Sequence, residues 1–175
     1  IKTHILILPK ANQFQYTELE FQQILEDIKF CKKLKCDGIV VGALNSNLSV
    51  NKTQTKCMVD IARPMKVTFH RAFDCTINMN QALNDIIDCG CDYLLTSGQK
   101  ENVIDGIKNL KQIVKLANKK ISIIAGGGVN HNNIASLYEI GIREFHLSGK
   151  EPNKFGELET NYENINMAVK RVESL

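Results

Sequence analysis

Residues 67–74 read VTFHRAFD, an apolar run of β type that ends directly against polar side chains. His70 closes the run, Arg71 follows it, and the carboxylate of Asp74 comes three residues later. Placing an imidazole, a guanidinium and a carboxylate together costs free energy unless they pair or face water or a ligand. The kind of sheet that holds this strand therefore decides what the three residues do.

The same unit, a short apolar run followed by a helical pattern, repeats along the whole chain. The predicted strands cover residues 4–8, 38–42, 66–70, 92–96, 121–125 and 143–147. The predicted helices cover residues 17–35, 52–62, 80–89, 101–118, 132–140 and 161–172, the last after a polar loop. Thr17 and Glu20 have the spacing of a capping box at the first helix. Six β–α units without a hairpin predict a parallel sheet with crossover helices. The continuous apolar runs are typical of strands that are covered on both faces.

Two architectures hold parallel β–α units, an open doubly wound sheet and a closed barrel. A dinucleotide-binding open sheet would carry a glycine-rich loop after its first strand, where residues 8–14 read LPKANQF. Instead, GGG at 126–128 follows the fifth predicted strand and SG at 148–149 follows the sixth, as at the end of an eight-stranded barrel. We therefore predict a single domain over residues 1–175, a TIM-type (β/α) barrel with six of eight units, the first two being absent.

Composition and charge exclude several classes of function. The 22 basic and 19 acidic residues leave a net charge of +3, which gives no electrostatic basis for binding nucleic acid. No apolar run approaches the ~20 residues of a membrane helix, and the start of the chain lacks the features of a signal peptide. Residue 1 is Ile, so we expect the natural product to begin upstream or to be processed. The six cysteines have no zinc-finger or disulfide-scaffold spacing and indicate reduced, packing thiols in a cytoplasmic protein.

Several long strings, in this order and spacing, resemble the copper homeostasis protein CutC family. They are DGIVVGAL (37–44), VTFHRAFD (67–74), LLTSGQ (94–99), IIAGGGV (123–129) and REFHLSG (143–149). The resemblance covers nearly the whole chain and is weakest at residues 149–160. It implies a TIM-type barrel, a cytoplasmic protein and a role in copper homeostasis, with Cu(I) bound in some members.

The chain departs from the pattern of this family in two places. Family members open with two β–α units that have no counterpart here, and the cysteines proposed as Cu(I) ligands lie on those strands. No metal ligand can therefore be carried over to residues 1–175, and we expect this segment alone not to hold copper. In addition, LPKANQF at 8–14 stands where the family usually has an Arg-Pro-Arg-Gly-Gly-Asp-Phe-type loop, which removes two charges from the barrel mouth.

Residues at the carboxyl ends of barrel strands line the functional face. The candidate catalytic residues, as a hypothesis, are His70, Arg71, Asp74 and His146. The alternative is that Arg71 and Asp74 form an ion pair beside a hydrogen-bonded histidine. That pair could also orient a bound anion. His70 and His146 could meet across the lumen and bind a metal, or could be two ordinary hydrogen-bonded histidines.

Glycine and serine loops at the same strand ends predict a site for a small anionic ligand. Backbone N–H groups after the fifth strand, together with the dipole of a following helix, could bind a phosphate or carboxylate. The candidate anion-binding residues are Ser97, Gly98, Gly126, Gly127, Gly128, Ser148 and Gly149. The simpler interpretation is that the glycines only allow tight turns. Lys150, just after the last strand, is predicted to be an ordinary solvated lysine.

Three functions therefore stay open at this point. The first is a CutC-type role in copper homeostasis or copper binding, and the second is a TIM-barrel enzyme acting on a small anionic or phosphorylated substrate. The third is an inactive, truncated remnant. Six strands of eight would leave two exposed sheet edges that invite pairing between chains, so we expect a homo-oligomer.

Overall fold

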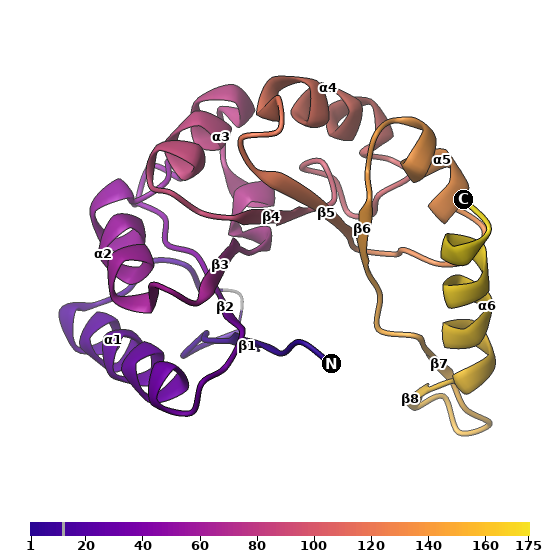
Figure 1. Ribbon diagram of the computed structural model, residues 1–175, viewed down its shortest axis with the longest axis horizontal. Helices are drawn as coiled ribbons and strands as arrows, with labels where there is room; N and C mark the ends of the chain where they lie inside the picture. The colour runs from indigo at the N-terminus through magenta and orange to yellow at the C-terminus, as the bar shows by residue number, and fades with distance from the viewer. Residues whose placement is uncertain (12) are drawn as a thin grey trace.

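The computed structural model describes residues 1–11 and 13–175, so Asn12 in the loop at 8–14 lies outside the described residues. Six parallel strands form one sheet in the order β1-β2-β3-β4-β5-β6. They are β1 His4–Leu6, β2 Gly38–Val41, β3 Lys66–Phe69, β4 Tyr93–Thr96, β5 Ser122–Gly126 and β6 Glu144–His146. The sheet curls into an arc with helices along its outer side (Figure 1). Because each strand lies beside its predecessor without a reversal of order, the curled half-barrel predicted from the sequence is confirmed, and the doubly wound sheet is excluded.

Helices alternate with these strands as predicted. They are α1 Glu18–Lys33, α2 Lys52–Ala62, α3 Met79–Asp88, α4 Ile107–Ala117, α5 Ile134–Glu139 and α6 Tyr162–Glu173, and the short 3-10 helix η1 covers Arg71–Cys75. The capping box at α1 is present, with the Glu20 amide donating to Thr17 Oγ1 at 3.3 Å and the Thr17 amide donating to the Glu20 carboxylate at 2.9 Å. Among the described residues, no helix is both long enough and apolar enough to cross a bilayer.

Three segments differ from the prediction. The helix predicted from residue 101 begins only at Ile107, because the side-chain oxygen of Asn102 accepts hydrogen bonds from the amides of Ile104 and Asp105 and closes a turn there. Asn130 and Asn133 delay α5 in the same way, since the Asn130 amide donates to the Asn133 side chain at 2.9 Å. The predicted polar loop before α6 contains an antiparallel hairpin of β7 Lys150–Pro152 and β8 Leu158–Thr160.

The two faces of the curled sheet carry different kinds of side chain. Val67 and Phe69 are fully buried in the hydrophobic core, whereas Thr68 and His70 line a cavity on the concave face. This alternation along β3 is the one predicted from the sequence. The outer face therefore packs against the helices and stabilises the fold. The concave face carries the side chains that line the cavity.

The strand register brings several carboxyl ends to one rim of the sheet. Phe69 lies opposite Leu94, Thr96 opposite Ala125, and Gly126 opposite His146. Residues that follow β3, β4, β5 and β6 along the chain therefore emerge at the same level, although up to about 80 residues separate them. Three of the sequence strings therefore meet at this rim: VTFHRAFD (67–74), LLTSGQ (94–99) and the GGG of residues 126–128.

Candidate anion site at the carboxyl ends of the strands

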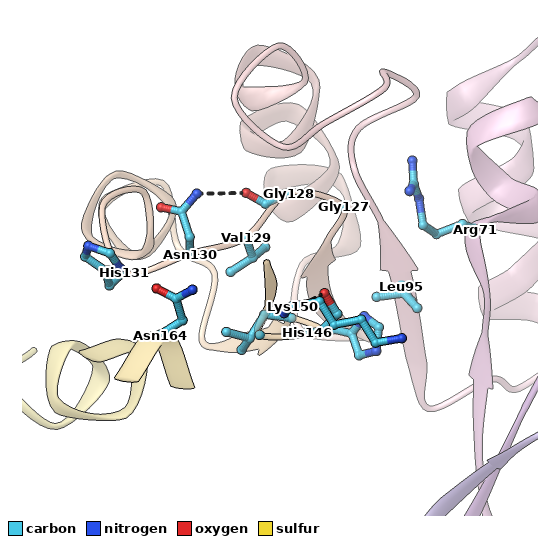
Figure 2. Close-up of a pocket in the computed structure, with 13 residues that line it drawn as sticks. Arg71, Leu95, Gly127, Gly128, Val129, Asn130, His131, His146, Lys150 and Asn164 are labelled. Atoms are coloured by element: carbon cyan, nitrogen blue, oxygen red, sulfur yellow. Dashed lines mark hydrogen bonds between the residues drawn. The ribbon is translucent and has the colours of Figure 1, made fainter. Parts of the chain in front are cut away.

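A cavity of about 550 Å³ opens at the carboxyl ends of β4, β5 and β6. Figure 2 shows Arg71 and Leu95 on one side of it, with His131 and Asn164 on the other. Within the part of the chain that the structure describes, no acidic residue lines this cavity. Four basic side chains do line it: Arg71, His131, His146 and Lys150. Such a concentration of donors and positive charge favours an anionic occupant.

The cavity gathers some of the predicted site residues and leaves others out. The anion-binding candidates that line it are Gly127, Gly128, Ser148 and Gly149, and the catalytic candidates are Arg71 and His146. Lys150, predicted to be an ordinary solvated lysine, is indeed exposed but also lines the cavity. His131 was not predicted, although its place three residues after the GGG string could have indicated it. His70, Asp74, Ser97, Gly98 and Gly126 are placed elsewhere.

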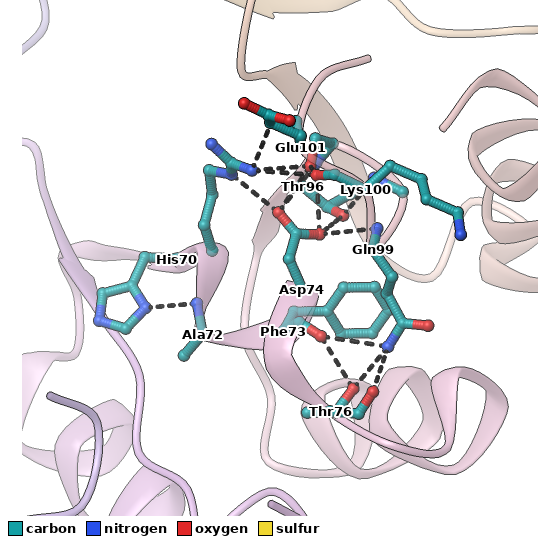
Figure 3. A network of polar contacts seen from close by, with 12 residues as sticks. His70, Ala72, Phe73, Asp74, Thr76, Thr96, Gln99, Lys100 and Glu101 are labelled. Carbon is teal, nitrogen blue, oxygen red and sulfur yellow. Dashed lines mark hydrogen bonds and ion pairs between the residues drawn. The ribbon is translucent and has the colours of Figure 1, made fainter. Parts of the chain in front are cut away.

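A network of hydrogen bonds surrounds Asp74 at the end of β3 (Figure 3), and Arg71 belongs to it. Its Nε donates to Asp74 Oδ2 at 2.8 Å, and its Nη2 donates to Ser97 Oγ at 2.8 Å. Nη2 also donates to two backbone carbonyls of the loop after β4 at 3.3 Å. Nη1 has no acceptor among residues 1–11 and 13–175, and a Cβ built on Gly127 would lie 2.9 Å from it. One edge of the guanidinium is therefore anchored, and the other is free to donate beside the glycine turn.

Both oxygens of the Asp74 carboxylate accept hydrogen bonds from other groups of the protein, so Asp74 acts as a positioning residue. Its Oδ1 accepts from the Thr96 hydroxyl and from the amides of Ser97 at 3.3 Å and Gln99 at 3.0 Å. Its Oδ2 accepts from the amide and the hydroxyl of Ser97, in addition to Arg71. The Asp74 side chain is 8% exposed. The structure thus places Asp74 behind the rim, where it orients Arg71 and the loop after β4.

Ser97 and Gly98 also lie behind the rim. Ser97 Oγ is occupied by Arg71, Asp74 and the carbonyl of Lys100. Gly98 packs so closely that an added Cβ would come 2.5 Å from the carbonyl oxygen of Gly106. Both residues are buried, and neither lines the cavity. The structure therefore gives them a supporting place next to Arg71, and no direct access to a ligand.

The turn after β5 has a backbone conformation that glycine adopts easily and other residues rarely adopt. Gly127 and Gly128 have φ values of +108° and +73°, which a residue with a Cβ would enter only with strain. The Gly127 carbonyl accepts from the Val103 amide at 2.9 Å, and the Gly128 carbonyl accepts from the Asn133 side chain at 2.8 Å. The amides of Gly127 and Gly128 have no acceptor within the described ranges of the chain.

The predicted help from a helix dipole is wrong. The helix α5 begins at Ile134, several residues after the glycines, and has only 6 residues. Asn130 and Asn133 fill the space between them with side-chain turns. Gly126, at the end of β5, serves close packing, since an added Cβ would lie 2.5 Å from Leu95 Cδ1. Any anion at this turn is bound by amides and cationic side chains alone.

His70 is buried beside the site and is neutral. Its Nδ1 accepts from the Ala72 amide at 3.2 Å and so caps η1. Burial lowers the pKa of His70 to about 4, so the single ring proton sits on Nε2. Nε2 is buried and has no hydrogen-bond partner in the described part of the chain. At neutral pH this imidazole can donate one hydrogen bond and cannot serve as a base through Nδ1.

The described residues form no three-ligand metal site. His70 and His146 line a common cavity on the concave face, but across the described ranges no three His, Cys, Asp or Glu residues come together in a group that could hold a metal. Cu(I) prefers thiolate ligands, yet Cys31, Cys89 and Cys91 are buried. Burial raises the pKa of Cys91 to about 12, which disfavours its thiolate.

Fold and site together define a half-barrel of parallel β–α units with a basic, glycine-lined rim. The chain belongs to the CutC family, whose family model matches residues 1–151. A CutC family protein of Bacteroides fragilis is 40% identical over 156 residues, which cover 89% of this chain and 62% of that protein. One of Parabacteroides distasonis is 37% identical over 175 residues, covering 99% and 72%. The chain thus spans about three fifths of the length of the first of these relatives.

One solved structure supports the same assignment, and a second shares the fold. The chain is similar to a structure from Streptococcus agalactiae that is named as a copper homeostasis protein CutC, with a TM-score of 0.79 and 28% identity over 83% of this chain and 72% of that one. A thiamine phosphate pyrophosphorylase from Pyrococcus furiosus has a TM-score of 0.59 at 16% identity, covering 89% and 73%. The second likeness shows the fold alone.

Proposed function

We propose that this chain is the anion-binding part of a CutC protein that works in copper homeostasis, and that its ligand is a small phosphorylated molecule. The observation that carries the proposal is Arg71, which Asp74 anchors while its Nη1 stays free beside Gly127. A guanidinium held in one orientation loses little entropy on binding and matches phosphate geometry. The copper role is carried over from the name of the Streptococcus agalactiae protein.

The chemistry around Arg71 suits a tetrahedral phosphate better than a planar carboxylate. The free Nη1, the amides of Gly127 and Gly128, and the side chains of His146 and Lys150 provide donors from several directions. A phosphate has three terminal oxygens to meet them, whereas a carboxylate has two. The proposal is one of binding, and it assigns no bond-breaking step to His146 or any other residue.

Titration with inorganic phosphate tests the proposal. We expect calorimetry to show one site, and expect NMR to show the amide signals of Gly127 and Gly128 moving with the same affinity. Arg71→Gln should weaken binding about tenfold or more, because a charge-assisted hydrogen bond to phosphate is worth roughly 1.5–3 kcal/mol. Arg171→Gln, which removes the same charge from the exposed surface of α6, should leave the affinity unchanged. Equal affinities in the two variants would reject the site.

For copper, we infer that the metal is cargo of the whole protein and that residues 1–175 alone do not retain it. The support is the lack of a three-ligand group within the described residues. We expect the reduced chain to lose Cu(I) to an excess of a Cu(I) chelator, measured by the absorbance of the chelator complex. Retention of one equivalent would contradict this, and its loss in Cys75→Ser would place the metal at the exposed cysteine. A cytoplasmic location, where thiols stay reduced, is part of the proposal and agrees with six free cysteines.

A further inference from the structure

A second cavity adjoins the anion site and runs along the concave face of the sheet. Its volume is about 440 Å³, and it shares Arg71, Leu95 and His146 with the anion cavity. The two cavities therefore meet at the rim. A molecule held by Arg71 at one end can extend into the other.

The lining of this second cavity is mostly apolar. Leucine, isoleucine, valine and phenylalanine side chains supply most of it, namely Leu6, Leu8, Phe14, Val40, Leu95 and Ile124. In the described part of the chain no lysine, aspartate or glutamate lines it, so Arg71 is its one permanently charged side chain. An apolar cavity of this size holds a ring or a branched chain more readily than a polar group.

His70 gives this cavity one hydrogen-bond donor. The residue is 5% exposed, its Nδ1 is occupied by the Ala72 amide, and its Nε2 has no partner among the described residues. A buried donor without an acceptor is uncommon in proteins and points to a group that the protein meets only when a ligand binds. Phe14, whose ring centre lies 5.0 Å from the imidazole centre, lines the same cavity beside His70.

We propose that the occupant of this site is a phosphate monoester of an apolar alcohol. The phosphate lies against Arg71 and the Gly127–Gly128 turn, the apolar body lies in the concave-face cavity, and an oxygen of the ligand accepts from His70 Nε2. This inference rests on the proposed function and adds the class of ligand to it. A free inorganic phosphate fills only one of the two adjoining cavities.

Three phosphates, compared at a pH where each is a dianion, distinguish the parts of this proposal. Inorganic phosphate tests the rim alone, glycerol 3-phosphate adds a polar body, and phenyl phosphate adds an apolar one. We expect phenyl phosphate to bind the 175-residue chain about tenfold more tightly than glycerol 3-phosphate by calorimetry, since a buried ring removes apolar surface from water. In NMR, phenyl phosphate should move the imidazole signals of His70, and inorganic phosphate should not.

Two matched variants keep the test specific. Ile124→Thr places a hydroxyl in the concave-face cavity, and should weaken phenyl phosphate several-fold while leaving inorganic phosphate unchanged. Ile77→Thr makes the same chemical change at a residue that is 78% exposed and lines neither cavity, and should change nothing.

The outcomes separate this inference from the proposed function. If inorganic phosphate binds at Arg71 but phenyl phosphate binds no better than glycerol 3-phosphate, the ligand class is wrong and the anion site stands. Equal effects of the two Ile→Thr variants on phenyl phosphate would also reject the ligand class. If none of the three phosphates binds, the anion site itself fails, and the inference fails with it.

Discussion

A neutral imidazole buried at the end of β3 makes this fold sensitive to acid. The pKa of His70 falls from an ordinary value of 6.5 to about 4 because burial disfavours the charged form. Between these two pH values the unfolded chain binds more protons at this position than the folded chain does. The folded state therefore has its full stability above pH 6.5 and loses it as the pH falls toward 4. At 1.36 kcal/mol for each pH unit, the loss approaches about 3 kcal/mol.

The variant His70→Asn isolates this effect. Asparagine keeps a side-chain oxygen that can accept from the Ala72 amide and cap η1, but it does not titrate. We expect its free energy of unfolding to be lower at pH 7 because of lost packing, and the gap to the unsubstituted chain to close by about 3 kcal/mol between pH 7 and pH 4. Urea unfolding at several pH values measures the gap. Parallel pH profiles for the two proteins would show that His70 is not the titrating group.

The contacts of Arg71 and Asp74 show which interactions can be predicted from the sequence and which cannot. An ion pair between Arg71 and Asp74 was one of two interpretations left open by the sequence, and the structure shows the pair at 2.8 Å. The sequence could not tell that Asp74 also accepts from Thr96, Ser97 and Gln99, because those donors come from a loop more than twenty residues away. Contacts over such separations depend on the strand register, which leaves no local pattern in the sequence.

At the scale of single elements, the turn after β5 decides whether the anion site is open. Gly127 has a φ of +108°, and a Cβ there would lie 2.9 Å from Arg71 Nη1. Gly127→Ala should therefore strain the backbone and also push the guanidinium away from its free position. We expect a loss of about 1–2 kcal/mol in the free energy of unfolding, and at least a tenfold loss in phosphate affinity by calorimetry.

A second glycine provides the matched control for this turn. Gly156 has a φ of +81°, and an added Cβ there would meet nothing within 4 Å. Gly156→Ala carries the same kind of backbone strain without the intrusion, so its phosphate affinity should equal that of the unsubstituted chain. If both alanine variants bind phosphate normally, the turn does not shape the site.

The bounds of helices and strands were predicted well where they follow the periodicity of apolar residues. They were predicted poorly where a polar side chain hydrogen-bonds to the backbone and closes a turn. The strands fall within one or two residues of the predicted ranges, and α2 has the predicted bounds, because burial on the outer face requires the apolar runs that the sequence shows. The start of α4 was misplaced by six residues, since Asn102 closes a turn with its side chain. The helix α5 begins two residues later than predicted and has only 6 residues, so it is too short to supply the dipole that was expected at the glycines.

On the scale of residues 1–175 as a whole, the curled sheet has two unpaired edge strands. Among the described residues, β1 pairs only with β2, and β6 pairs only with β5. On β1, Ile5 is 40% exposed and Leu6 is 58% exposed, so apolar side chains accompany the unpaired backbone groups. Such an edge is a template for another strand. The sequential strand order agrees with the barrel architecture that the glycine and serine loops after the fifth and sixth strands predicted.

We therefore predict that the chain associates with itself through these edges. Analytical ultracentrifugation should show a dimer or larger species, and Ile5→Lys should shift it toward the monomer, because a charge at an edge opposes strand pairing. Leu158→Lys puts the same charge on the hairpin strand β8, where Leu158 is 67% exposed, and should leave the association unchanged. A monodisperse monomer of the unsubstituted chain at high concentration would contradict the prediction. So would equal sedimentation of the two lysine variants, since only one of them alters an edge of the curled sheet.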